Sequence, residues 1–377
     1  MTHSTKELTV NILGTRGIPE GHSGFETFVL HLAPFLRDKG WKVNVYCQLE
    51  PDEDGHLEPD FEDDWNGIRR IHLGSTKTSS AGSIIFDWRT VKHVLNEPGV
   101  DLVLGYNTAV FNLVQRLRGR SVLMNMDGVE WKRAKWSLPV KIWFYFNEFI
   151  GANFSSVPIA DHPEIAKHLH RHGCFRSTII PYGSYRIDET PAEPLASLGI
   201  EPNNFFVSIA RIEPENSILD LVKAFCSKPR KVKLVVLGRM IEGRPFTNEL
   251  RAAANENVIF PGPIFDQKIV SALRKYALGY LHGHQVGGTN PSLVESLGAG
   301  SAIVAHDNRF NRWVAGPDQF YFSSIEELSD IYDRLSDDPS IADNAREKAQ
   351  ERHAEAFEWD HVLSQYEEIL RKEAMKN

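Results

Sequence analysis

The stretch LTVNILGTRGIPEGHSGFETFVLHLAPFLRDKGWKVNVYC, residues 8–47, contains the strand, helix and strand on which the fold is built. The apolar runs at 8–13 and 42–47 are typical of buried strands. Residues 26–37 between them have a helical period, and Gly40 is a typical stop signal. The apolar face of this helix consists of Phe28, Val29, Leu32 and Leu36. A strand, a crossover helix and a strand predict a parallel pair covered by the helix.

The same alternation continues along the chain. In the first half, further strands are predicted at Ile68–Leu73, Asp101–Tyr106, Ser121–Met126, Phe154–Ile159 and Thr178–Pro181. A second series is predicted at Asn204–Ala210, Lys233–Leu237, Val258–Phe260, Leu278–Leu281 and Ser301–Ala305. Helical patterns lie between most of these runs, which predicts an α/β protein with mostly parallel sheets covered on both faces.

The length of 377 residues suits two domains. Residues 188–202 contain three prolines and little periodicity, so they are the predicted linker. We expect an N-terminal Rossmann-like domain at 1–187, joined by a C-terminal helix at 356–377, and a second Rossmann-like domain at 188–355. Two such domains would face each other across a ligand-binding cleft. Periodicity alone leaves open whether the last helix packs on the first domain or on its own.

Composition excludes several classes of protein. The net charge of −8 and the pI of about 6.0 argue against nucleic-acid binding. Three widely spaced cysteines, Cys47, Cys174 and Cys226, form neither a disulfide framework nor a zinc motif, which favours a reducing, cytoplasmic location. The first eight residues are polar and no apolar run reaches about 18 residues. Any membrane contact is therefore expected to be peripheral.

Two glycine-containing loops are candidate phosphate sites. Gly14-Thr15-Arg16-Gly17 follows the first strand, although a tight structural turn explains it about equally well. The second loop, residues 282–290, follows a predicted strand and opens a helix that Thr289 or Asn290 can cap. Its Gly287 and Gly288 expose backbone donors where the helix dipole favours an anion. Glu295, one turn into that helix, suits a hydroxyl group such as that of ribose.

Four motifs together carry a resemblance to a known family. They are ILGTRGIP (12–19), GFET (24–27), DGVEWKR (127–133) and GGTNPSL (287–293). The run PSLVESLGAG, residues 291–300, resembles the donor-site signature of retaining GT-B glycosyltransferases of family 4. The combination is more closely similar to the bacterial polysaccharide rhamnosyltransferase subgroup with a DUF1972-type N-terminal domain. The resemblance covers both halves and implies the GT-B fold, a last helix crossing back to the first domain, and no metal or other cofactor.

The resemblance also implies roles on the donor side. Arg211 matches the family arginine that holds the donor diphosphate, whereas Asn216 stands where the family has lysine. Of the family's two glutamates, the second matches Glu295 and the first falls on Gly287, which suits a deoxysugar donor. The expected donor-binding residues are Gly14, Thr15, Arg16, Gly17, Asn216, His284, Gly287, Gly288, Thr289, Asn290 and Ser292. The expected catalytic residues are Asp127, Glu130, Arg211 and Glu295.

On the acceptor side, the resemblance points to Asp127, where the family often has histidine. Asp127 and Glu130 suit sugar or acceptor hydroxyls, while Lys132 and Arg133 suit an acceptor phosphate. Glu26 is a further expected acceptor-binding residue. A solvated turn and helix start is the alternative explanation for the segment.

Three other segments have open or unremarkable interpretations. Residues 135–146 interleave cations with aromatics, which suits either an anionic lipid surface or a core helix. Residues 50–64 hold nine acidic residues and no Lys or Arg, so a solvated loop is predicted although Asp52 and Asp54 form an Asp-x-Asp motif. His168 and His172 share a helical face, but no third ligand is suggested, so we expect no metal site.

The expected function is that of a retaining glycosyltransferase, a hexosyltransferase that moves rhamnose from dTDP-rhamnose to a lipid-linked saccharide in cell-surface polysaccharide synthesis. A UDP-hexose or UDP-N-acetylhexosamine transferase is the nearest alternative. A sugar-nucleotide epimerase and a non-catalytic sugar-nucleotide-binding protein are the others. The expected partners are the nucleotide sugar, the lipid-linked acceptor and, peripherally, the inner membrane surface.

Overall fold

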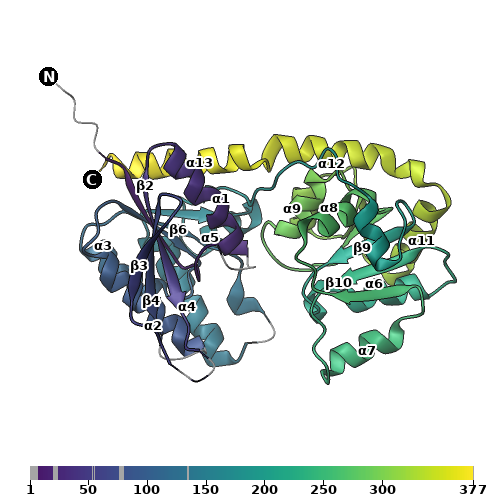
Figure 1. Ribbon diagram of the computed structural model, residues 1–377, viewed down its shortest axis with the longest axis horizontal. Helices are drawn as coiled ribbons and strands as arrows, with labels where there is room; N and C mark the ends of the chain where they lie inside the picture. The colour runs from purple at the N-terminus through teal and green to yellow at the C-terminus, as the bar shows by residue number, and fades with distance from the viewer. Residues whose placement is uncertain are drawn as a thin grey trace. The chain divides into compact units, whose positions relative to one another are not determined.

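The computed structural model describes residues 7–19, 24–52, 54, 56–75, 80–133 and 136–376. The chain divides into two compact units (Figure 1). One comprises Met1–Pro181 with Asp360–Asn377, and the other comprises Tyr182–Trp359. The predicted linker, 188–202, lies within the second unit and does not separate the two. Leu195 and Ile200 explain this placement, because both side chains are buried in that unit's core.

An eight-stranded sheet forms the centre of the first unit, in the order β3-β4-β2-β1-β5-β6-β7-β8. Its strands are β1 (Thr9–Leu13), β2 (Lys42–Leu49), β3 (Phe61–Trp65), β4 (Ile68–Gly74), β5 (Val100–Leu104), β6 (Val122–Asn125), β7 (Val157–Ala160) and β8 (Thr178–Ile179). All neighbours pair in parallel except β3 and β4, which are antiparallel. Strands β1 and β5 are buried throughout, as expected for a parallel sheet covered on both faces.

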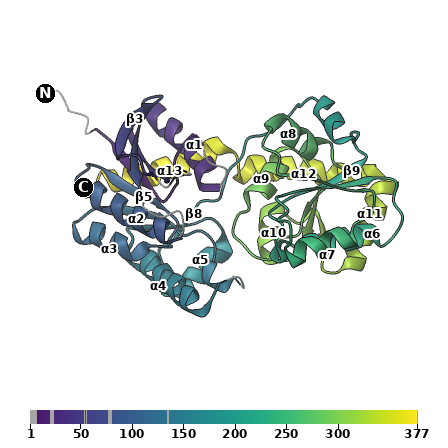
Figure 2. The same ribbon diagram turned by 60° about the horizontal axis from the view of Figure 1, so that its bottom comes forward.

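Helices cover both faces of this sheet. They are α1 (Gly24–Asp38), α2 (Ser80–Val94), α3 (Ala109–Leu117), α4 (Leu138–Phe154), α5 (Pro163–Arg171) and α13 (Trp359–Ala374), with a 3-10 turn η1 (Glu130–Lys132). Figure 2 shows α1 beside α13 on one side of the sheet, and α2, α3 and α4 on the other.

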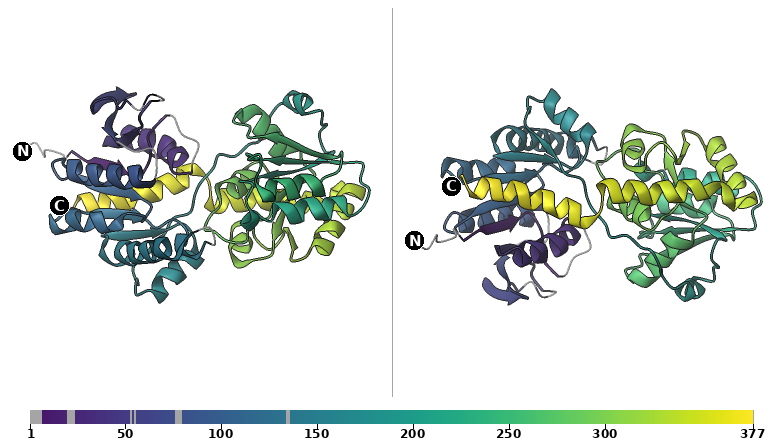
Figure 3. Two further views of the ribbon diagram at one scale, coloured as in Figure 1. Left: turned by 90° about the horizontal axis from the view of Figure 1, so that it is seen from below. Right: turned by 90° about the horizontal axis from the view of Figure 1, so that it is seen from above.

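The last helix, α13, is anchored to the first unit, where it is drawn in yellow in Figure 3. The ring of Tyr366 lies 4.7 Å from that of Phe28, and its hydroxyl accepts a hydrogen bond from Asn125 Nδ2 at 2.9 Å. Trp41 Nε1 donates to Glu367 at 3.2 Å. The apolar stripe near the C-terminus is thus buried against the first sheet's helices and strands, although it lies far away in sequence.

The second unit contains a six-stranded parallel sheet, in the order β11-β10-β9-β12-β13-β14. Its strands are β9 (Phe205–Ile209), β10 (Lys233–Leu237), β11 (Val258–Gly262), β12 (Gly279–His282), β13 (Ile303–His306) and β14 (Phe320–Phe322). Its helices are α6 (Ile218–Cys226), α7 (Pro245–Ala253), α8 (Gln267–Tyr276), α9 (Pro291–Gly298), α10 (Arg309–Ala315), α11 (Ile325–Asp337) and α12 (Asp343–Ala356), with 3-10 turns η2 (Glu193–Leu198), η3 (Pro214–Asn216) and η4 (Pro339–Ala342).

Alternating strand residues divide the core of this unit into two layers. Phe206 and Leu234 face the layer formed with α6 and α11. Val207 and Val235 face the opposite layer, formed with α8, α9 and α12. Successive side chains of a strand point to opposite faces, so continuous apolar runs become buried on both sides.

The structure corrects the interpretation of the acidic segment. Residues 61–65 form strand β3, which pairs with β4, and not the predicted solvated loop. Asp63 lies opposite Arg70 and forms an ion pair with it, while Glu62 pairs with Arg69 at 2.8 Å. Opposite charges across an antiparallel pair stabilise the strand, which a count of acidic residues along one segment does not reveal.

The structure differs from the predicted strands at two further places. Strand β14 has no counterpart in the sequence analysis, because it is only three residues long. Phe154, predicted to begin a strand, instead ends α4. Among the described residues, no helix combines the length and apolar character needed to cross a membrane.

Candidate donor and acceptor sites

In the second unit, two loops at the carboxyl ends of neighbouring strands lie together. One follows β9 and includes Arg211 and η3, and the other, 283–290, follows β12. The backbone N–H of Gln285 donates to Glu215 O at 3.1 Å, and its side chain donates to Ser217 Oγ at 2.9 Å. A Cβ at Gly283 would lie 2.3 Å from Asn216 O, so only glycine permits this close approach. Carboxyl strand ends are where open α/β sheets bind ligands.

The same loop is held from its other side by α10. Asn308 and Asn311 both donate a side-chain hydrogen bond to His284 O, at 3.0 and 2.9 Å. The sequence analysis missed both asparagines. They lie at the start of α10, where Asn308 also caps the helix. The loop is therefore fixed before any ligand arrives, which lowers the entropy cost of binding.

The predicted cap of α9 is confirmed. Asn290 has extended backbone angles and its side chain accepts a hydrogen bond from Ser292 N at 3.0 Å, while Pro291 occupies the first turn. Gly287 has φ +145°, and no atom lies within 4 Å of where its Cβ would be. Thr289 is buried and Gly288 is half-buried. The result is a helix N-terminus with free space beside Gly287.

Arg211 and Asn216 differ in what surrounds them. The Arg211 side chain is exposed and, within the described part of the chain, makes no ion pair or hydrogen bond. Asn216 is buried, and its Nδ2 donates to Arg211 O at 2.8 Å. Asn216 thus shapes the turn that carries Arg211, whereas the Arg211 guanidinium is available for an anion.

Glu295 has a partner that the sequence analysis missed. Arg274 on α8 forms an ion pair with Glu295 and donates to Ser292 Oγ at 3.3 Å. The Arg274 side chain is only 6% exposed, compared with 32% for Glu295. Tyr280 OH lies 2.7 Å from Ser292 Oγ and completes the network. The signal that could have indicated this ion pair is the arginine among the buried positions of α8, because a buried guanidinium requires a partner.

Two histidines lie where β12 enters the loop. The His282 and His284 rings stack at 4.3 Å with an interplanar angle of 10°. Burial lowers the pKa of His282 well below its usual value, so its imidazole is neutral. Neither ring nitrogen of His282 has a hydrogen-bond partner among the residues described.

In the first unit, the loop after β1 is held by Glu26. Glu26 Oε1 accepts from Arg16 N at 2.9 Å and from Thr15 Oγ1 at 3.2 Å. Gly14 has φ +85°, and a Cβ there would lie 2.2 Å from Leu104 O. Gly17 N donates to Thr15 Oγ1 at 3.2 Å. The second oxygen of Glu26 is buried and has no hydrogen bond among the described residues, so it is an available acceptor.

Asp127 and Glu130 follow β6 but differ in their surroundings. Asp127 is partly exposed with φ +48°, and its N–H donates to Asn125 Oδ1 at 2.9 Å. Both oxygens of Glu130 are engaged, by Arg133 Nη1 at 2.5 Å and Trp136 Nε1 at 3.1 Å. Lys132 is exposed, with its ammonium 5.2 Å from the Trp131 ring. Asp127 is thus partly exposed at the carboxyl end of β6, whereas Glu130 holds Arg133 in position.

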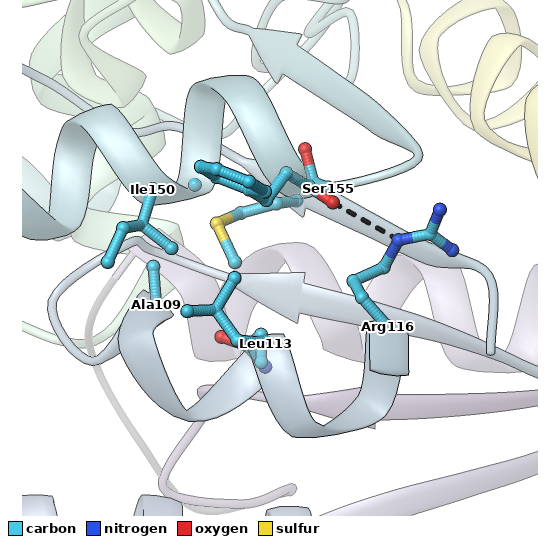
Figure 4. Close-up of a pocket in the computed structure, with 9 residues that line it drawn as sticks. Ala109, Leu113, Arg116, Ile150 and Ser155 are labelled. Carbon is cyan, nitrogen blue, oxygen red and sulfur yellow. Dashed lines mark hydrogen bonds between the residues drawn. The ribbon is translucent and has the colours of Figure 1, made fainter. Parts of the chain in front are cut away.

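A small cavity between α3 and α4 is separate from these residues (Figure 4). Its volume is about 10 Å³, and its lining includes Ala109, Leu113 and Ile150. Arg116 Nε donates to Phe154 O at 3.1 Å beside it. This volume suits about one water molecule and excludes a sugar nucleotide.

Comparison with known families agrees with this architecture. Residues 7–185 match the family described as "Domain of unknown function (DUF1972)", and residues 193–352 match "Glycosyl transferases group 1". Among curated proteins, none matches the sequence.

Solved structures of similar fold cover nearly the whole chain. Sucrose-phosphate synthase from Thermosynechococcus elongatus has a TM-score of 0.82 at 16% identity, covering 97% of this chain and 99% of the other. An Anabaena protein in complex with UDP and glucose has a TM-score of 0.74 at 16% identity, with coverages of 97% and 100%. A UDP-forming trehalose-phosphate synthase from Burkholderia xenovorans has a TM-score of 0.70 at 10% identity, with coverages of 97% and 100%. These similarities establish two Rossmann-like domains of the GT-B type.

Proposed function

We propose that this chain, a glycosyltransferase of the GT-B fold, transfers rhamnose from dTDP-rhamnose to a hydroxyl of a lipid-linked saccharide. The observation that carries the donor site is the exposed Arg211 in the loop after β9, which contacts the loop leading to the capped N-terminus of α9. A guanidinium and free helix N–H groups are complementary to a diphosphate. The similar structures whose descriptions include UDP or UDP-2-fluoro glucose support a nucleotide-sugar donor.

The donor side of the proposed mechanism stabilises the leaving group. As the bond between the sugar's anomeric carbon and the diphosphate oxygen breaks, negative charge develops on the diphosphate. Arg211 and the Gly287–Asn290 backbone stabilise that charge. The acceptor oxygen bonds to the same face of the anomeric carbon, and its proton passes to the departing diphosphate. The configuration is therefore retained. Glu295 accepts hydrogen bonds from ribose hydroxyls, held in place by Arg274.

Arg211→Ala is expected to weaken binding of both dTDP and the intact donor about ten-fold or more, because a charged hydrogen bond contributes about 1.5–3 kcal/mol. Isothermal titration with dTDP measures the loss. Lys348→Ala is the matched control, since Lys348 is a cation on α12 that pairs with Glu351. Unchanged dTDP affinity in Arg211→Ala would remove this arginine from the site.

The sugar specificity follows from Gly287. Glycine has no side chain to bond the sugar hydroxyls, and the space around it is open. A hexose hydroxyl placed there would lack the partner that a glutamate provides, which favours a deoxysugar. With a lipid-linked saccharide present, competition between dTDP-rhamnose and UDP-glucose is expected to favour dTDP-rhamnose. Preference for UDP-glucose would reject rhamnose alone, whereas donor turnover without any acceptor product would contradict transfer itself.

We assign the reaction no divalent cation at the donor diphosphate. Arg211 supplies positive charge there. Asp52 Oδ1 accepts backbone hydrogen bonds from Asp54 and His56, at 3.1 and 2.7 Å. EDTA is expected to leave kcat/KM unchanged, whereas activity that EDTA abolishes and Mg²⁺ or Mn²⁺ restores would contradict this assignment.

The acceptor side belongs to the first unit in this proposal. Asp127 accepts a hydrogen bond from a reacting hydroxyl, and Lys132 and Arg133 bind the phosphate of the lipid carrier. Glu26 offers its unengaged oxygen to an acceptor hydroxyl. A lipid carrier requires a surface that meets the membrane, and α4 supplies one.

The exposed side of α4 is apolar along its length. Its exposed large apolar residues are Leu138, Ile142, Trp143, Tyr145, Phe146, Phe149 and Phe154. Lys141 lies in the same helix. Aromatic and aliphatic side chains with a neighbouring cation suit the headgroup region of an anionic bilayer. We place the chain peripherally on the cytoplasmic face of the plasma membrane through this helix.

The double variant Ile142→Ser, Phe146→Ser is expected to lower binding to phosphatidylglycerol-containing vesicles about ten-fold or more, because each exposed apolar side chain contributes about 1.5–3 kcal/mol when buried. Vesicle co-sedimentation measures it. Ile241→Ser is the control, since Ile241 is an exposed aliphatic residue of the second unit. Equal binding of the double variant and the native chain would exclude α4 as the contact.

A further inference from the structure

A cluster of three potential metal ligands lies in the first unit, outside the proposed donor and acceptor residues. Glu148 comes from α4, His168 from α5, and His172 follows α5 by one residue. Histidines four residues apart on a helix share one face, and the fold brings Glu148 against that face. The absence of a third ligand, expected from the sequence, is thus corrected by the tertiary structure.

The spacing of the donor atoms fits a small cation. Glu148 Oε1 lies 2.9 Å from His168 Nε2 and 3.4 Å from His172 Nδ1. One ligand atom from each residue lies within 4.8 Å of the other two. Ligand atoms of a tetrahedral zinc site lie about 3.3 Å apart when the zinc–nitrogen distance is near 2.0 Å. Small side-chain rotations therefore suffice to place all three atoms around one ion.

The burial of the cluster calls for a positive partner. The Glu148 side chain is 2% exposed and that of His168 is 10% exposed. His172 Nδ1 is buried and makes no hydrogen bond with any described residue, although it faces the Glu148 carboxylate. A buried carboxylate and an unsatisfied imidazole nitrogen both cost free energy, and a bound cation removes both penalties.

A further contact orients the carboxylate. Trp131 Nε1 donates to Glu148 Oε2 at 3.1 Å, which leaves Oε1 directed at the two histidines. A donor that hydrogen-bonds a ligating carboxylate in this way fixes its direction and raises metal affinity. Trp131 belongs to η1, so the contact also connects this turn to α4.

We infer that Glu148, His168 and His172 bind one Zn²⁺ ion, with water as the fourth ligand. Two imidazoles and one carboxylate are a donor set that zinc prefers over magnesium or calcium. His172 is 17% exposed on its side chain, which provides an entry path for the ion and room for the water. The ion joins α4, α5 and η1, and so stabilises the segment that carries Lys132 and Arg133. This inference does not depend on the proposed reaction.

The test is zinc titration of the full-length chain after removal of metal by a chelator and dialysis. We expect one zinc per chain, saturable binding by calorimetry and a rise in Tm on zinc addition. Glu148→Gln and His172→Gln are expected to abolish the saturable binding, and Trp131→Phe to weaken it about ten-fold or more. His170→Gln is the matched control, because His170 is exposed on the same helix and packs on Phe175.

Three results would overturn the inference: no binding by the native chain, binding unchanged in Glu148→Gln and His172→Gln, or an equal loss in His170→Gln. Circular dichroism of the metal-free variants checks that they are folded. If both ligand variants fail to fold, Co²⁺ added to the native chain decides the question. Visible absorption of four-coordinate Co²⁺ that zinc abolishes supports the site, and its absence rejects it.

Discussion

Asp127→Asn is expected to lower kcat/KM about ten-fold to 100-fold while leaving the fold unchanged. The proposed role of Asp127 is to accept a hydrogen bond from a reacting hydroxyl, and a hydrogen bond to a charged group contributes about 1.5–3 kcal/mol. Asparagine is the appropriate replacement, because Asp127 has φ +48° and asparagine tolerates this left-handed backbone. Alanine would add backbone strain to the loss of the carboxylate. Initial rates with donor and lipid-linked acceptor measure the effect.

Glu130→Gln is the control for Asp127→Asn. It lies three residues away and loses its negative charge, but its oxygens are engaged by Arg133 and Trp136. As a positioning residue it is expected to change KM for the acceptor more than kcat. Near-native activity of Asp127→Asn would exclude the carboxylate from the reaction. A larger loss of kcat in Glu130→Gln than in Asp127→Asn would mean that Glu130, and not Asp127, contacts the reacting hydroxyl.

Glu295→Gln is expected to have two separate effects, a lower Tm and a higher KM for the donor. It leaves the Arg274 guanidinium, which is 6% exposed, without its carboxylate. Removing one partner of a fully buried pair costs about 3–5 kcal/mol. Because Glu295 is 32% exposed, we expect a smaller cost, about 2 kcal/mol, which lowers the Tm by about 5 °C. The KM rises because a neutral amide accepts hydrogen bonds from ribose more weakly than a carboxylate.

A double variant separates the two effects. Arg274→Met together with Glu295→Gln removes the unpaired guanidinium and is expected to recover most of the Tm, since most of the cost of breaking a buried ion pair comes from the charge left uncompensated. The donor KM is expected to stay high, because the ribose acceptor is still absent. Recovery of both Tm and KM in the double variant would show that Glu295 only neutralises Arg274.

The fold class was predictable because the apolar strand runs and the helical periods both indicated a parallel α/β unit. In the segment at 8–47, apolar runs and a helical period follow each other at the lengths that a parallel unit requires, and the structure has β1, α1 and β2 there. The cap of α9 was equally predictable to within two residues, Thr289 or Asn290, since a cap side chain accepts from a backbone N–H two residues away, as Asn290 does. Such interactions depend on residues near in sequence.

The charge partners were not predictable in this way. Arg274 and Glu295 lie on different helices, and although an arginine at a buried position of α8 indicates that it has some partner, nothing in the sequence of either helix identifies Glu295 as that partner. The acidic residues of β3 were interpreted as a solvated loop, because the arginines of β4 that pair with them lie outside that segment. Ion pairs between elements follow from packing, and packing follows from the whole core.

The sequence by itself predicted most of the strands and helices in their order, and it narrowed the cap of α9 to Thr289 or Asn290. These properties depend on backbone sterics and on hydrogen bonds within a few residues. Only the tertiary structure decided that Glu148 faces His168 and His172 and that Arg274 pairs with Glu295. The packing of the last helix on the first unit, which periodicity left open, agrees with what the family resemblance implied. The contacts of Glu148 with His168 and of Trp41 with Glu367 join residues 20 and 326 positions apart, and burial of both sheet faces is what brings them together.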